Sequence, residues 1–211
     1  MIGLLNWRTG LLAVSVLVCL WSSATAQRLP DQLVLELTEE LYELVDSQRD
    51  VYKDNPAMLK EAVDQRMRQH VDTVYSARLV LGRYGRSLSN EQIAQFADAL
   101  GSSLMDQYAT RLLDFDRDNV VEVLPLEANQ DPRRTRVRTR LTLDNGSLMP
   151  VDYVMRQVNE RWLVFDVIVE GISYVATFRN QIGEQIAAEG FDQTLARLQQ
   201  GQLALSADEG S

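Results

Sequence analysis

The residues best suited to acid–base chemistry lie in one apolar segment, Trp162 to Ile182. Asp166 and Glu170 are four residues apart, so an extended strand would place both carboxylates on one face, where they could act as general acid and general base. Alternatively, they lie on the outer face of a sheet and pair with Arg156 or Arg179. We favour this second interpretation, because nothing else in the segment is suited to catalysis.

The inventory of reactive side chains is small. The chain has one histidine, His70, and one cysteine, Cys19, so His/Cys metal sites and Cys–His nucleophiles are not expected. His70 lies where a predicted helix ends, a common position for a structural histidine. The sequence also has no glycine-rich phosphate loop and no Gly-x-Ser-x-Gly motif. We therefore predict no catalytic residues and no metal ligands.

Four arginines alternate along one predicted strand: Arg134, Arg136, Arg138 and Arg140. All four lie on the face opposite Val137 and Leu141. We interpret them as a solvated outer face. The alternative is a basic stripe on an acidic protein that docks an acidic partner.

The N-terminus is typical of a secretory signal peptide. Met1 to Arg8 is basic, Gly10 to Trp21 is a short apolar run, and Ala24-Thr25-Ala26 fits a cleavage site, so we expect residues 1–26 to be removed. Val18, which precedes Cys19, is too large for a lipoprotein site. The formal charge of −9 would become −10 on loss of Arg8. This charge argues against binding to nucleic acid or to an anionic membrane surface.

The length of the remaining chain fits a single domain. We expect residues 27–200 to form that domain and residues 201–211 to be a flexible tail. Helical periodicity dominates residues 33–108, with a capping box at Ser89 and Gln92. Further helices are expected from Ser173 to Glu189 and from Phe191 to Gln200.

Between the helical parts the hydrophobic period changes to two. Strands are expected at 121–123, 134–143, 148–157 and 162–170. A three-residue loop in Asp144-Asn145-Gly146-Ser147 predicts the pairs Leu143–Met149, Leu141–Val151 and Thr139–Tyr153, because this register keeps one face apolar. The loop near Asn159 predicts the pairs Met155–Phe165, Tyr153–Val167 and Val151–Val169.

This pattern predicts an α+β protein in which a twisted antiparallel sheet of about four strands is covered by several helices. The apolar face of the sheet could form a filled core with those helices. The helices could also stand away from the sheet and leave a cavity. Periodicity does not distinguish the two, although a filled core is the commoner arrangement.

The sequence resembles the MlaC family of periplasmic phospholipid-binding proteins, also known as toluene-tolerance proteins. The resemblance covers residues 30–198 and is carried by "WLVFDVIVEGISYVATFRNQI", "EGFDQTLARL", "LVLGRYGRSLSNEQIAQFADAL" and "DQYATRLL". Its most specific residues are Trp162, Asp166, Glu170 to Ser173 and Arg179, with Leu81-Gly82-Arg83 and Glu91-Gln92. Gly85 departs from it, since a tryptophan is expected there.

The resemblance implies a periplasmic carrier with no cofactor, whose cargo is a phospholipid held by its tails in an apolar cavity between sheet and helices. We also expect a monomer, because the largest apolar face is already covered. It also implies exchange between an outer-membrane MlaA–porin complex and an inner-membrane ABC transporter. The residues expected to line the cavity are Leu104, Tyr108, Val137, Leu141, Val151, Tyr153, Met155, Phe165, Val167, Val169, Val175 and Phe178. Gly171 is expected to let the chain turn without a Cβ clash.

Two alternatives belong to other functional classes. One is an enzyme that acts on a hydrophobic small molecule through Asp166 or Glu170, which requires a carboxylate inside the cavity. The other is an interaction module with a filled core, in which the stripe from Arg134 to Arg140 is the working surface.

Overall fold

A computed structural model describes residues 29–115, 117–127, 131–203 and 205–206. The predicted signal peptide, residues 1–26, lies outside these ranges. Within them, no helix is both long enough and apolar enough to cross a bilayer.

The described ranges contain seven α-helices, grouped before and after the sheet. They are α1 (Pro30–Ser47), α2 (Arg49–Asp54), α3 (Pro56–Met67), α4 (Thr73–Leu81), α5 (Asn90–Tyr108), α6 (Tyr174–Glu189) and α7 (Phe191–Gln199). Three short 3-10 helices join them, namely η1 (Arg68–His70), η2 (Tyr84–Ser87) and η3 (Ala109–Asp114). The α+β class is thus confirmed.

Side chains that cap the helices explain where several of them begin. The capping box predicted at Ser89 and Gln92 is present at the start of α5. Asn55 caps α3 and Asp72 caps α4 in the same way, each by accepting a hydrogen bond from a backbone N–H three residues later. The starts of the helices that surround the site are therefore fixed by local sequence.

The sheet is antiparallel with the strand order β1-β2-β3-β4-β5. The strands are β1 (Val121–Val123), β2 (Arg134–Thr142), β3 (Leu148–Val158), β4 (Arg161–Val169) and β5 (Ile172–Ser173). The first four are those predicted from sequence. The short β5 is an addition.

The first long hairpin has a three-residue loop, but its predicted pairing was wrong by two residues. Leu141 pairs with Met149 and Thr139 with Val151, while the N–H of Leu143 donates to the carbonyl of Ser147. The three residues between Leu143 and Ser147 permit only this closer pairing. A shift of two residues leaves every side chain on its predicted face.

The second hairpin turns through Asn159 and Glu160, both with positive φ. The predicted pairs Val151–Val169 and Tyr153–Val167 are present. The predicted pair Met155–Phe165 is not: a bulge beside Met155 makes Val164 its partner instead.

The bulge changes the face on which Phe165 lies. Val164 packs with Met155 in the core beneath α1. The ring of Phe165 instead meets the edge of Tyr75 on α4, with ring centroids 5.1 Å apart, and lies under the guanidinium of Arg134. The extra residue in β4 thus brings an aromatic side chain to the α4 side of the sheet.

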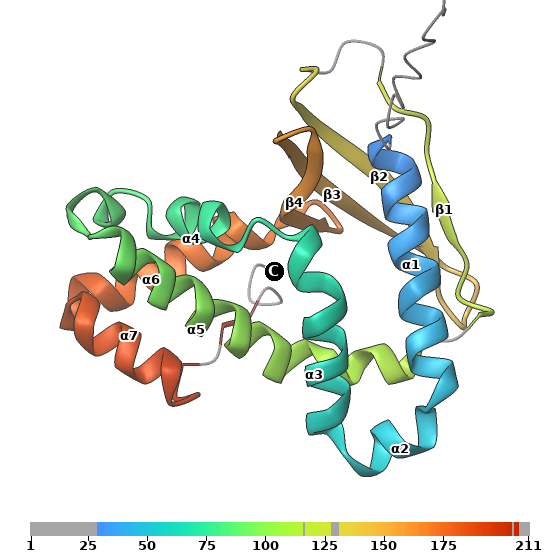
Figure 1. Cartoon of the computed structure of the whole chain (residues 1–211), viewed down its shortest axis with the longest axis horizontal. Coiled ribbons are helices and arrows are strands. Elements are labelled where there is room, and N and C mark those ends of the chain that lie inside the picture. Colours follow the sequence, from blue (N-terminus) through green and yellow to red (C-terminus); the bar gives the residue numbers. More distant parts are fainter. Residues whose placement is uncertain (1–28, 116, 128–130, 204, 207–211) are drawn as a thin grey trace, which may run out of the picture.

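Figure 1 shows two groups of helices with α3 between them. On one side α1 lies across the sheet, and Leu33 and Val34 fill the space above Val137 and Met155. On the other side α4, α5, α6 and α7 form a second core around Phe96 and other buried side chains.

Part of the segment expected to be a flexible tail, residues 203 and 205–206, contacts this second core or α6. Leu203 and Leu205 are buried, and the side-chain amide of Gln181 on α6 donates to the carbonyl of Ser206. Buried side chains are therefore found after residue 200, at Leu203 and Leu205.

Candidate functional site

An apolar pocket of about 520 Å³ lies where α3, α4, α5 and α6 meet β4. The β4 residues that line it, Val164 to Val167, are those at and just after the bulge. The chain between η1 and α4 runs alongside them, with Val71 bridging to Val164 and the N–H of Asp72 donating to the carbonyl of Val164. The pocket therefore lies beside the bulge, where the chain between η1 and α4 pairs with the edge of the sheet.

Polar groups inside the pocket are satisfied by the protein itself. The hydroxyl of Ser76 donates to the carbonyl of Phe165 at 2.7 Å. The carboxylate of Asp166 accepts from the hydroxyl of Ser173 at 2.6 Å and from the N–H of Val175 at 3.0 Å. Because these groups already have partners, the interior presents chiefly apolar surface to a ligand.

Charged side chains of the pocket lie on α3 and η1 on one side and on α5 on the other. Lys60, Asp64 and Arg68 follow at intervals of four residues on α3 and η1. Asp98, Ser102 and Asp106 do the same on α5. We call these six residues the rim. Asp106 does not itself line the pocket, but we include it because it forms an ion pair with Lys60.

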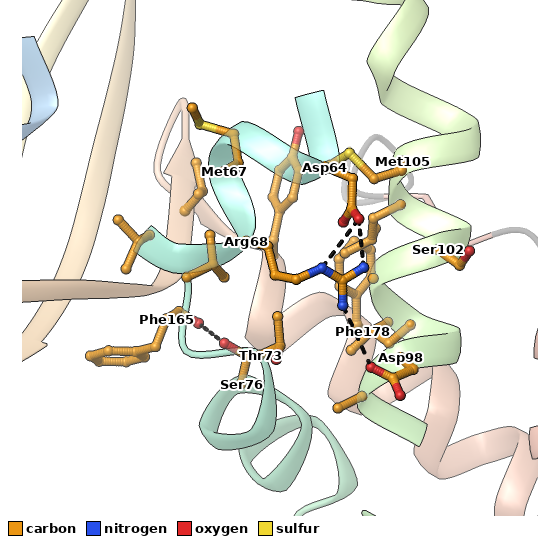
Figure 2. A pocket seen from close by; sticks show the side chains of 18 of the residues that line it. Asp64, Met67, Arg68, Thr73, Ser76, Asp98, Ser102, Met105, Phe165 and Phe178 are labelled. Carbon is orange, nitrogen blue, oxygen red and sulfur yellow. Dashed lines mark hydrogen bonds and ion pairs between the residues drawn. The ribbon is translucent and has the colours of Figure 1, made fainter. Parts of the chain in front are cut away.

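Ion pairs join the two sides of the rim. Lys60 pairs with Asp106, and its Nζ lies 3.5 Å from the hydroxyl of Ser102. At the other end, Nη1 of Arg68 lies 4.0 Å from Oδ1 of Asp98. Figure 2 shows the Arg68 guanidinium between Asp64 and Asp98.

Asp64 holds Arg68 in place from the same side of the rim. Its Oδ2 accepts from Nε at 3.2 Å and from Nη2 at 2.5 Å. These hydrogen bonds and the negative charge of Asp64 raise the pKa of Arg68 above its usual value. The guanidinium is therefore a permanent cation beside the pocket.

Five of the twelve side chains predicted to line a cavity do line this pocket: Leu104, Phe165, Val167, Val175 and Phe178. The other seven lie elsewhere: Tyr108, Val137, Leu141, Val151, Tyr153, Met155 and Val169. Val137 and Met155 are 0% exposed beneath α1, and Tyr153 packs against the same cluster. Tyr108 lies against Tyr174 of the lining, with ring centroids 5.9 Å apart.

The pocket is displaced from its expected position along the centre of the sheet. Helix α1 fills that central region, so the open space lies at the edge formed by β4. Sequence reasoning missed Met67, Val80 and Met105 in the lining and the whole rim. The available signal was Lys60, Asp64 and Arg68, whose charges alternate at helical spacing.

The arginine stripe lies on β2, and most of its charges have acidic neighbours. Arg136 pairs with Asp152. Arg138 pairs with Glu127, and the β1–β2 register places Glu122 opposite Arg140. Arg134 stacks on Phe165, as noted above. The stripe is therefore largely charge-compensated.

Gly171 has a role that differs from the predicted one. A Cβ at this position would meet no atom within 4 Å, so a clash is not the reason for glycine. Its φ of +87°, following a φ of +51° at Glu170, forms the tight turn between β4 and β5.

An α+β fold with an internal apolar pocket and a charged rim defines a small binding protein. The chain belongs to the MlaC family: the family profile, described as MlaC protein, matches residues 35–200.

Two curated relatives are similar over most of their length. The toluene tolerance protein ttg2D of Pseudomonas putida is 30% identical over 168 residues, which cover 79% of this chain and 77% of the relative. The intermembrane phospholipid transport system binding protein MlaC of Haemophilus influenzae is 24% identical over 204 residues, covering 95% and 94%.

A solved structure shares the fold. It is the phospholipid-binding protein from Ralstonia solanacearum in complex with a phospholipid, which superposes with a TM-score of 0.69 at 23% identity. The match covers 78% of this chain and 96% of the other.

Proposed function

We propose that this protein is a periplasmic phospholipid carrier that moves lipid between the outer membrane and an inner-membrane ABC transporter. The observation that carries the proposal is the pocket of about 520 Å³, whose interior is apolar and whose charges lie along the α3–α5 rim. Such an arrangement suits an amphipathic ligand with its tail inside and its head group at the rim. The names of the relatives from Haemophilus influenzae and Ralstonia solanacearum support the same ligand class.

The physical need for a carrier comes from the cost of moving acyl chains through water. Two chains with about 30 methylenes in total carry about 24 kcal/mol of transfer free energy, at about 0.8 kcal/mol for each methylene. A pocket as apolar as the bilayer removes most of this barrier. Transfer then needs no covalent step, so the function requires no catalytic residue.

The size of the pocket bears on how much of the cargo it holds. Ligand pockets range from about 300 to 1,000 Å³, and we expect a diacyl lipid to need the upper end. The observed volume is about half of that upper value. We propose that the described conformation has room for part of the cargo and that α3 and α5 separate to admit the rest.

The same proposal includes the oligomeric state of the carrier and its protein partners. The carrier is a monomer that meets an MlaA–porin complex at the outer membrane and an Mla-type ABC complex at the inner membrane. Arg134, Arg136, Arg138 and Arg140 are the proposed docking residues. Their acidic neighbours make this a weak electrostatic surface, which suits transient contact.

Native mass spectrometry of the purified mature protein, followed by lipid extraction of the same sample, tests the carrier function. We expect an additional mass equal to that of a diacyl phospholipid, released on denaturation. A bare polypeptide mass after incubation with phospholipid vesicles would overturn the proposal and favour an interaction module.

A separate variant tests docking. Arg138→Glu combined with Arg140→Glu should leave lipid occupancy unchanged and slow lipid transfer to vesicles that contain the transporter complex. Arg133→Glu, an exposed change just before β2, serves as the control.

A further inference from the structure

The rim pairs opposite charges across the pocket in a fixed register. Lys60 on α3 pairs with Asp106, and Arg68 on η1 lies near Asp98, so the residues of the two sides meet in opposite chain order. The two ends of the rim differ in how tightly they are closed. Lys60 forms a close ion pair, whereas the Arg68–Asp98 contact of 4.0 Å exceeds hydrogen-bonding distance.

The Arg68–Asp98 end is also the more accessible. The side chains of Arg68 and Asp98 are 64% and 77% exposed. Asp64 holds Nε and Nη2 of Arg68, which leaves Nη1 directed towards Asp98. An incoming charged group can therefore enter between Arg68 and Asp98 without breaking the contacts that orient the guanidinium.

We propose that the Arg68–Asp98 end of the rim is a head-group site that selects zwitterionic phospholipids over anionic ones. The proposal rests on the carrier function proposed above. The phosphate of the lipid binds Nη1 of Arg68, and its ammonium group binds the carboxylate of Asp98. Each charge of the separated ion pair then has a new partner of the correct sign.

An anionic head group has no ammonium group to bind Asp98. Its phosphate satisfies Arg68 but leaves Asp98 without a cation beside a new negative charge. Discrimination thus comes from a repulsive contact as well as an attractive one. The rim as a whole also disfavours an anionic head group. Its three carboxylates, Asp64, Asp98 and Asp106, outnumber its two cations, Lys60 and Arg68.

The expected selectivity is about fivefold. One uncompensated contact between unit charges about 4 Å apart, in water-like surroundings, changes a binding constant by about that factor. The contribution should weaken as ionic strength rises, because the groups are exposed.

The test uses the purified mature protein stripped of lipid and vesicles of equimolar phosphatidylethanolamine and phosphatidylglycerol with identical acyl chains. After incubation the protein is separated, and its bound lipid is quantified by mass spectrometry. We expect a bound ratio of about 5:1 in favour of phosphatidylethanolamine. A ratio equal to that of the vesicles would overturn the head-group site while leaving the carrier function intact.

Variants locate the selectivity. Asp98→Asn should bring the bound ratio close to 1:1, and Asp98→Lys should favour phosphatidylglycerol. Glu184→Gln on α6 changes the net charge by the same amount as Asp98→Asn, at an exposed position outside the pocket lining. It should keep the wild-type ratio. An unchanged ratio in folded Asp98→Lys would overturn the assignment. Failure of wild-type protein to take up either lipid would instead overturn the carrier function.

Discussion

Asp166 on β4 accepts a hydrogen bond from the backbone N–H of Val175 on α6, at 3.0 Å. Its second oxygen accepts from the hydroxyl of Ser173, whose oxygen in turn accepts from the N–H of Ala176. The carboxylate thus holds the start of α6 against the sheet, where a negative charge also complements the helix dipole. Although Asp166 lines the pocket, both of its oxygens are occupied.

Loss of the Asp166 carboxylate should lower the stability of the fold. It should not abolish an enzymatic activity, because the carboxylate holds the start of α6. We expect Asp166→Ala to lower the free energy of unfolding by about 1–3 kcal/mol, since two partly buried hydrogen bonds are lost. Asp166→Asn keeps an acceptor oxygen and should lose less. Urea unfolding measures the change, and lipid occupancy of the folded fraction should match wild type. An Asp166→Asn variant of normal stability that abolished turnover of a hydrophobic substrate would support the enzyme alternative.

Gly101 on α5 offers a way to fill the pocket without disturbing the fold. It lines the pocket, and a Cβ built on it meets no atom within 4 Å. Gly101→Phe should therefore occupy the space reserved for cargo and reduce lipid occupancy severalfold. The same change replaces a helix-interior glycine with a better helix former, which stabilises α5 by a few tenths of a kcal/mol.

The control is Gly101→Ala, which also replaces the helix-interior glycine, with a larger gain in helix propensity, but adds a single methyl group. It should keep most of its lipid. Native mass spectrometry gives occupancy, and thermal unfolding gives stability. Full occupancy in a folded Gly101→Phe protein would mean that the cargo lies elsewhere.

Much of the fold could be predicted because its signals are local. The capping box at Ser89 and Gln92, the change of period after Asn119 and the turn at Asp144-Asn145-Gly146 each depend on a few neighbouring residues. The pairing of the first hairpin differs from the predicted one by two residues, so the side chains of β2 and β3 lie on their predicted faces.

The position of the pocket could not be predicted because the bulge in β4 leaves no mark in the sequence. Trp162 to Val169 is almost continuously apolar, so alternation cannot reveal where one extra residue is inserted. An inserted residue reverses the face of Phe165 relative to its expected partner. The rim was missed for a different reason: Lys60, Asp64 and Arg68 look like an ordinary solvated helix face until α5 is packed beside them.

Lipid exchange should require α3 and α5 to separate. Asp64 and Ser102 occupy matching positions between the two ion pairs, and the predicted mature chain has no cysteine. Asp64→Cys with Ser102→Cys, joined by a short cleavable thiol crosslinker, should slow lipid exchange with vesicles at least tenfold. Cleavage of the crosslink should restore the rate in the same sample, which provides the control. Exchange at the uncleaved rate in fully crosslinked protein would show that cargo passes by another route.

Tyr153 gives a pH dependence with a defined sign. Burial of its side chain, with a smaller contribution from Tyr42, raises the pKa of Tyr153 to about 12 from a usual value of 10. Between these two values the unfolded chain loses the phenolic proton and the folded chain keeps it. The free energy of unfolding should therefore fall as pH rises from 10 to 12, by about 2–3 kcal/mol from this group.

Urea unfolding of wild type and Tyr153→Phe at several pH values isolates the effect, because the other titrating groups are common to both. The difference in stability between the two proteins should be constant below pH 10, and above pH 10 the wild type should lose stability relative to Tyr153→Phe. Curves that stay parallel through pH 12 would show that the Tyr153 hydroxyl is as well hydrated in the folded protein as in the unfolded chain.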